Sequence, residues 1–171
     1  MHEHDQAGSA DVLIIGAGIA GLSLATALGR QGFRVSVIDG ASRPEAPKPG
    51  KELQDWDLRV SALTPASIAF LAEIGVWRDA STHRAAPYDC MRVWDASGSG
   101  SIVFDAGEAD ASSLGHIVEN REILQALLQC AQALPCVELC WGHALETMSS
   151  AGSGWLATCS TGREFHTALA I

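Results

Sequence analysis

The hydrophobic pattern of the first forty residues predicts a strand, a glycine turn, a helix and a second strand. Residues 11–15 form a short apolar run, which is typical of a buried parallel strand. A helix is expected over residues 19–30, with Gly32 as its stop. Residues 34–38 form the second strand, which ends at Asp39. This order predicts one right-handed strand-helix-strand unit with parallel strands.

The rest of the chain mixes helical and strand patterns. Residues 41–57 are rich in proline and charge, so they predict a long loop that is functional or mobile. Helices are expected over residues 64–75, with Thr as the N-cap and Pro at the first position, and over residues 120–134. Residues 149–154 predict a turn. The remaining apolar runs predict strands over 91–94, 102–104, 116–118, 137–141, 145–148, 155–159 and 164–171, the first two forming a hairpin.

The two ends of the chain suggest its domain organisation. Apolar residues continue to Ile171, so the sequence stops inside a predicted strand and is interpreted as an N-terminal piece of a longer protein. Residues 1–10 are polar and are predicted to be a disordered tail. Residues 11–171 are expected to form one incomplete domain, long enough to bury a core.

Composition narrows the classes of partner. The chain has 11 basic and 20 acidic residues, a net charge of −9, which argues against nucleic acid as the main partner. Residues 12–29 carry no charge, but their four glycines favour a strand, a turn and a helix over a membrane span. The five cysteines form no pair motif and follow no signal peptide. They indicate free thiols in a reducing cytosol, and no structural metal is expected.

A glycine motif follows the first strand and opens the first helix. It consists of Gly16, Ala17, Gly18, Ile19, Ala20 and Gly21. The first glycine permits a tight turn, the second lets the backbone approach a pyrophosphate, and the third lets the helix lie close to the strand. The N–H groups of the first helical turn favour phosphates. Asp39 can accept hydrogen bonds from the ribose hydroxyls of an adenosine.

The motif predicts a dinucleotide site without choosing between FAD and NAD. The Tyr-x-x-x-Lys pair of short-chain dehydrogenases is missing, because Tyr88 has Arg92 at that spacing. Two alternatives stay open beside a flavoprotein: an NAD-binding oxidoreductase domain, and a non-catalytic assembly module that keeps the dinucleotide fold.

Four stretches, taken in order, resemble one family. They are residues 11–39, 58–77, 91–95 and 114–124, and the Leu-Gly-His-Ile-Val-Glu-Asn segment of the last is the most specific. The chain is similar to the class A flavin-dependent aromatic hydroxylases, and within them to the ubiquinone-biosynthesis hydroxylase family. The resemblance implies an α/β fold: a Rossmann-like FAD-binding domain of the GR2 type, with a parallel sheet, helices and an antiparallel hairpin or meander, truncated at its C-terminus. Residues 85–118 would contribute the start of the substrate-domain sheet.

The same resemblance assigns three further cofactor residues. Arg59 matches an arginine near the flavin pyrophosphate and ring, and Arg121, with Asn120 beside it, matches one near the ribityl-pyrophosphate region. A guanidinium pairs with a phosphate bidentately, which fits both positions. The alternatives are a solvated loop charge for Arg59 and an ordinary helix-start arginine for Arg121. The family commonly has Glu where Asp39 stands, so the side chain here is one methylene shorter and would fill the same role with slightly different geometry.

The resemblance also implies the chemistry of the parent enzyme. NAD(P)H would reduce FAD, and O₂ would add to give a flavin hydroperoxide that hydroxylates a polyprenylated phenol or quinol. The piece itself is expected to be inactive, because the family's second FAD motif is missing. No catalytic residue is assigned: His116 is interpreted as a strand-end histidine with a satisfied hydrogen bond.

Location and partners follow from the lipophilic substrate. A cytoplasmic protein is expected, with association at the inner-membrane surface or with a biosynthetic complex left open. The unfinished sheet edge would invite self-association.

Overall fold

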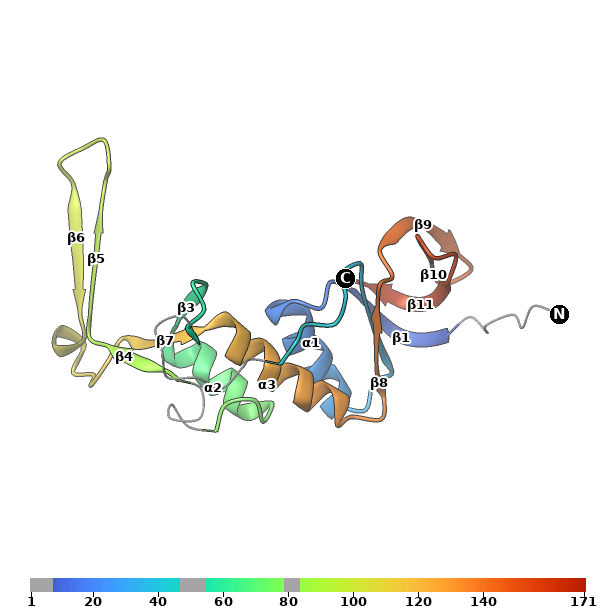
Figure 1. Ribbon diagram of the computed structural model, residues 1–171, viewed down its shortest axis with the longest axis horizontal. Coiled ribbons are helices and arrows are strands. Elements are labelled where there is room, and N and C mark those ends of the chain that lie inside the picture. Colours follow the sequence, from blue (N-terminus) through green and yellow to red (C-terminus); the bar gives the residue numbers. More distant parts are fainter. Residues whose placement is uncertain (1–7, 47–54, 79–83) are drawn as a thin grey trace. The chain divides into compact units, whose positions relative to one another are not determined.

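The computed structural model describes residues 8–46, 55–78 and 84–171, and it divides the chain into two compact units (Figure 1). The first, called the sheet unit here, comprises Met1–Ala46 and Leu124–Ile171. The second, called the hairpin unit, comprises Pro47–Ile123. The boundary falls within helix α3 (Asn120–Gln132).

The sheet unit contains a six-stranded sheet in the order β8-β2-β1-β11-β10-β9 (Figure 1). The first four strands in this order run parallel to one another. The last three form an antiparallel meander, so β11 belongs to both groups. Helix α1 (Ile19–Arg30) connects β1 to β2, which confirms the predicted strand-helix-strand unit. The strands are β1 (Gly8–Ile15), β2 (Val35–Asp39), β8 (Val137–Trp141), β9 (Leu145–Ala151), β10 (Gly154–Cys159) and β11 (Glu164–Ala170).

Strand β2 of this sheet is buried on both faces, as a continuous apolar run predicts for a parallel strand. Four consecutive residues of β2, Val35 to Ile38, are buried. One hydrophobic cluster brings together residues from five strands, β1, β2, β8, β10 and β11: Leu13, Ile38, Cys140, Ala157, Cys159 and Phe165. Burying one large apolar side chain stabilises a fold by about 1.5–3 kcal/mol, so this cluster holds the parallel strands and the meander together.

Two predicted segments have different limits in the structure. Strand β1 begins at Gly8, inside the tail predicted over residues 1–10, because the backbone from Gly8 onward pairs with β11 and Ala10 is buried. Residues 1–7 of that tail lie outside the described residues, as do residues 47–54 of the predicted loop over 41–57.

The predicted turn over residues 149–154 is too long. Strand β9 continues to Ala151, which pairs with Gly154 at the start of β10. Only Gly152 and Ser153 remain between the strands, and the backbone of Gly152 is left-handed, with φ of +62°. A two-residue hairpin turn with a glycine of positive φ matches the twist of the strands that it joins.

The hairpin unit contains a three-stranded antiparallel sheet, β3-β7-β4, and a separate two-stranded hairpin, β5-β6. Helix α2 (Pro65–Glu73) starts at Thr64, whose side chain accepts a hydrogen bond from the N–H of Ser67, so the predicted N-cap is confirmed. The strands are β3 (Val60–Leu63), β4 (Ala86–Tyr88), β5 (Cys90–Trp94), β6 (Ser101–Asp105) and β7 (Gly115–Glu119), and a 3₁₀ turn, η3, covers Ala106–Ala109.

The uncharged run over residues 12–29 is part of β1, the glycine turn and α1. Within the three described ranges, no helix has the length and apolar character needed to cross a bilayer.

Candidate dinucleotide-binding site

The glycine turn lies between β1 and α1 and depends on two glycines. Gly16 has φ of +108°, a conformation that residues with a side chain rarely adopt, and its N–H donates to the carbonyl of Ile38 at 2.8 Å. A Cβ on Gly21 would overlap the carbonyl oxygen of Gly16. Position 21 must therefore be glycine for α1 to lie this close to the turn, which is the role that the sequence predicts for it.

The N-terminus of α1 is open, in contrast to the crowded backbone at position 21. Its N-cap is Gly18, which offers no side-chain hydrogen bond, and its first turn contains no acidic residue. A Cβ on Gly18 would meet no atom within 4 Å. The first N–H groups of a helix need acceptors, and the helix dipole favours an anion there. The backbone at Gly18 therefore forms a cradle that fits a pyrophosphate.

Asp39 closes the same turn from the end of β2. Its Oδ2 accepts a hydrogen bond from the N–H of Ala17 at 2.7 Å, and its Oδ1 accepts one from the N–H of Ala41 at 2.8 Å. Each carboxylate oxygen has a second lone pair, so Asp39 can still accept hydrogen bonds from a ligand. The contact with Ala17 was not predicted: the sequence places an acid at the end of β2, but not against the turn.

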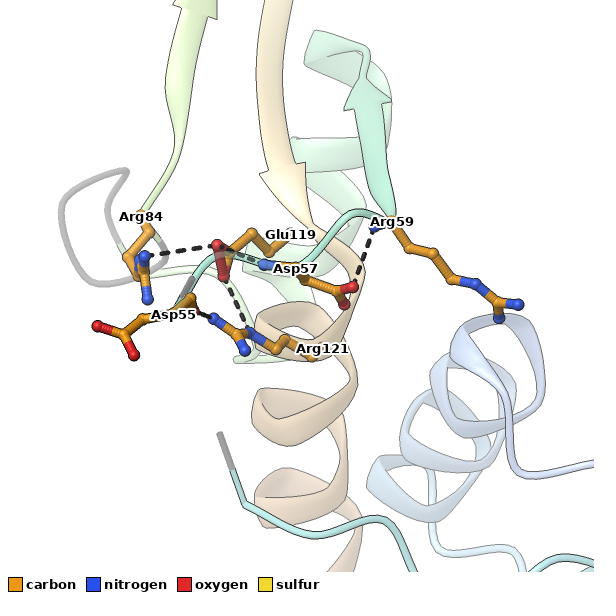
Figure 2. Close-up of polar contacts among 6 residues, drawn as sticks. All are labelled: Asp55, Asp57, Arg59, Arg84, Glu119 and Arg121. Carbon is orange, nitrogen blue, oxygen red and sulfur yellow. Dashed lines mark hydrogen bonds and ion pairs between the residues drawn. The ribbon is translucent and has the colours of Figure 1, made fainter. Parts of the chain in front are cut away.

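In the hairpin unit, Arg59 and Asn120 are tied together through the backbone. The N–H of Asn120 donates to the carbonyl of Arg59 at 2.9 Å, and the N–H of Arg59 donates to Oδ1 of Asp57 at 3.0 Å. The Oγ of Ser61 donates to Oδ1 of Asn120 at 2.6 Å. The side chain of Arg59 is exposed and points away from Glu119 and Arg121 (Figure 2). Its backbone is fixed, while its guanidinium contacts no other side chain among the described residues and can meet a ligand.

Arg121 belongs to an ion-pair cluster around Glu119 (Figure 2). Its Nε donates to Oε2 of Glu119 at 3.1 Å, and its Nη2 donates to the carbonyl of Asp55. Nη2 of Arg84 lies 3.6 Å from Oε1 of Glu119, and its guanidinium stacks 3.8 Å above the ring of Trp56. Glu119 and Arg84 were not among the residues predicted from the sequence. The available signal was an acidic residue at the end of a short apolar strand and directly before Asn120.

The predicted site residues thus form one group in each unit. The glycine turn and Asp39 meet in the sheet unit, and Arg59, Asn120 and Arg121 share a hydrogen-bonded cluster in the hairpin unit.

His116 differs from its prediction. Its Nδ1 is buried and has no hydrogen-bond partner among the described residues, so the expected satisfied ring is wrong at this atom. Its imidazole packs edge-on against Trp77, with ring centroids 6.0 Å apart. The contact fits a packing role within the hairpin unit.

The buried thiols are poor nucleophiles. All five cysteines are free, as predicted. Burial, together with the neighbouring charge of Glu138, raises the pKa of Cys140 to about 11, and burial also raises the pKa of Cys159. A thiol that stays protonated at neutral pH contributes to the core and not to chemistry.

The sequence of this chain is similar to those of two hydroxylases. The chain is 36% identical over 129 residues to 3-demethoxyubiquinol 3-hydroxylase of Escherichia coli, an alignment that covers 75% of this chain and 32% of that protein. It is 34% identical over 163 residues to the ubiquinone hydroxylase UbiL of Rhodospirillum rubrum, covering 95% of this chain and 36% of that protein. The chain therefore spans about a third of the length of these relatives.

Solved structures share the fold at lower identity. The structure of PqsL of Pseudomonas aeruginosa in complex with 2-aminobenzoylacetate matches this chain with a TM-score of 0.70 and 22% identity. The match covers 95% of this chain and 42% of the PqsL chain. The structure of p-nitrophenol 4-monooxygenase PnpA of Pseudomonas putida matches this chain with a TM-score of 0.70 and 19% identity. The match covers 96% of this chain and 40% of the PnpA chain. A family model described as an FAD binding domain matches residues 9–167. The fold, the glycine cradle and this match together show that the chain belongs to the FAD binding domain family.

Proposed function

We propose that this chain is the FAD-binding part of a monooxygenase that hydroxylates the aromatic ring of a polyprenylated phenol or quinol. The observation that carries the proposal is the open backbone cradle at Gly18, beside an uncapped helix N-terminus. Two relatives whose alignments cover most of this chain are named as a demethoxyubiquinol hydroxylase and a ubiquinone hydroxylase. Their names support the proposed class of substrate.

The residues present fit FAD, and each has a defined task in this proposal. The N–H groups of the first turn of α1, after Gly18, receive the pyrophosphate, and the remaining lone pairs of Asp39 accept from the ribose hydroxyls. The guanidiniums of Arg59 and Arg121 bind phosphate or flavin oxygens, with Asn120 orienting the backbone between them. When bound and reduced by NAD(P)H, FAD supplies the activation of O₂. The chain's own contribution is to bind and orient the cofactor.

The surroundings of the whole protein belong to the proposal as well. A polyprenylated substrate partitions into membranes, so we propose that the whole protein works at a membrane surface or within a biosynthetic complex. Co-sedimentation of the whole protein with lipid vesicles tests the first form, and recovery in the supernatant at all vesicle concentrations would contradict it.

A titration tests the cofactor assignment. The chain is titrated with FAD while flavin fluorescence is followed, and the titration is repeated with NAD as a competitor. The proposal predicts saturable binding of FAD that excess NAD does not displace. Binding of NAD in preference to FAD would instead support an NAD-dependent oxidoreductase, and binding of neither would contradict the proposed function of this chain.

A further inference from the structure

Glu119 is the most buried charged residue among the described residues, with 2% of its surface exposed. It is the last residue of β7 and directly precedes α3. A carboxylate in such a place is costly unless it is paired and hydrogen-bonded, because it has lost its water. The structure supplies three partners: the guanidiniums of Arg121 and Arg84 and the backbone N–H of Asp57.

The contact with Arg121 fixes the direction of its guanidinium. Glu119 holds Nε at 3.1 Å from one side, and the carbonyl of Asp55 accepts from Nη2 on another. A planar guanidinium held at two of its nitrogens has no remaining rotational freedom. Its Nη1 has no partner within the described part of the chain, so this edge presents donors to a ligand. The side chain of Arg121 is 28% exposed, which leaves that edge accessible.

A second series of hydrogen bonds connects Glu119 to Arg59. Oε1 of Glu119 accepts from the N–H of Asp57 at 3.2 Å, and the carboxylate of Asp57 accepts from the N–H of Arg59 at 3.0 Å. The carbonyl of Arg59 in turn accepts from the N–H of Asn120, the residue that follows Glu119. One buried carboxylate therefore sits at the centre of the contacts that hold Arg59, Asn120 and Arg121 (Figure 2).

We propose that Glu119 is the positioning residue for the two cofactor arginines, acting chiefly through Arg121. The inference rests on the proposed function, because it assumes that Arg121 contacts FAD. Glu119 itself would touch no cofactor: its side chain is buried and its two oxygens already face Arg121, Arg84 and Asp57.

The test is a double-mutant cycle on FAD affinity. Glu119→Gln keeps the shape of the side chain but removes its charge. It also replaces one of the two accepting oxygens with an NH₂ group, which cannot accept from Arg121 or Asp57. FAD affinity should fall about tenfold, the effect of losing a hydrogen bond to a charged group. In an Arg121→Ala background, the same Glu119→Gln change should have a much smaller effect on the affinity, because only the contacts through Asp57 to Arg59 remain. A merely structural role would lower the affinity equally in both backgrounds. Glu122→Gln, three residues further along in the first turn of α3, is the matched control and should bind FAD like the wild type.

The outcomes separate the inference from the function on which it rests. If the wild-type chain does not bind FAD, the proposed function is wrong and the inference falls with it. If the wild type binds FAD and Glu119→Gln binds it equally well, only the inference is overturned. If Glu119→Gln fails to fold, the side-chain Nε–H signal of Arg121 in the wild type decides by nuclear magnetic resonance. Slow exchange with water and a shift on FAD binding support the inference, and fast exchange overturns it.

Discussion

The carboxylate of Asp39 accepts a hydrogen bond from the backbone N–H of Ala17 at 2.7 Å, so the end of β2 directly holds the glycine turn. The other oxygen accepts from the N–H of Ala41, the residue two positions after Asp39. Asp39 therefore has a structural task even before a ribose is considered. The short side chain of Asp39 places its carboxylate within reach of the backbone of the turn.

Replacing Asp39 should consequently weaken both the fold and cofactor binding. Asp39→Ala leaves the N–H groups of Ala17 and Ala41 without their acceptor, which costs about 1–3 kcal/mol of unfolding free energy. Urea unfolding measures this loss, and titration with FAD measures the loss of affinity. Asp11→Ala is the control, because Asp11 accepts two hydrogen bonds from Arg34 at the exposed surface, where water can replace both and the ion pair contributes little. Equal losses of stability in the two variants would contradict the role given to Asp39.

Cys140 should make the fold sensitive to alkaline pH. Burial first, and then the charge of Glu138, raises the pKa of its thiol to about 11 from the ordinary value of 9.0. The unfolded chain therefore releases this proton at a lower pH than the folded chain. The stabilisation is complete below about pH 9 and is lost as the pH rises toward 11, with a total on the order of 2 kcal/mol.

Urea unfolding at about pH 8.5 and at about pH 10.5, below and above the range in which the thiol of the unfolded chain titrates, checks this expectation. The wild type should lose more stability between the two conditions than Cys140→Ala does. Cys90→Ala, which changes an exposed cysteine, should follow the wild type. The same pH dependence in Cys140→Ala and in the wild type would show that the thiol is not responsible.

The core of the sheet unit should depend on Phe165. Its side chain is fully buried in the cluster that joins the parallel strands to the meander. Phe165→Ala should lower the free energy of unfolding by about 3–5 kcal/mol, because it removes buried surface and leaves a cavity. Phe33→Ala is the matched control, since Phe33 is 46% exposed in the same unit and should change stability far less. Denaturant unfolding of the two variants checks this, and similar losses would place the core elsewhere.

The sequence predicted those parts of the fold whose signals are local. The strand, glycine turn and helix over residues 11–30 carry their own periodicity and turn residues, and Gly32, with φ of +88°, ends α1 as expected. Strands β3 and β4 were missed because each has only three or four residues and forms against β7. So short a run has no periodicity of its own.

In the candidate site, too, the features with a local sequence signal were predictable and those formed by distant residues were not. The glycine motif was predictable because each glycine has a backbone reason for its position, seen in the overlap that a Cβ on Gly21 would cause. The contacts of Glu119 were not predictable, because Asp57 and Arg84 are distant in sequence and meet it only in the folded unit. A buried charge on a short strand looks like any surface acid until its burial is known.

The central claim, that the backbone at Gly18 receives the pyrophosphate of FAD, is tested most directly by Gly18→Ala. A Cβ at this position meets no atom of the protein within 4 Å, so the variant should unfold at the same urea concentration as the wild type. The added methyl group would occupy the space needed for close approach of the pyrophosphate, so FAD affinity should fall by at least about tenfold. Gly21→Ala, whose Cβ overlaps the carbonyl of Gly16, should instead lose stability. A Gly18→Ala variant that is as stable as the wild type and binds FAD equally well would contradict the account.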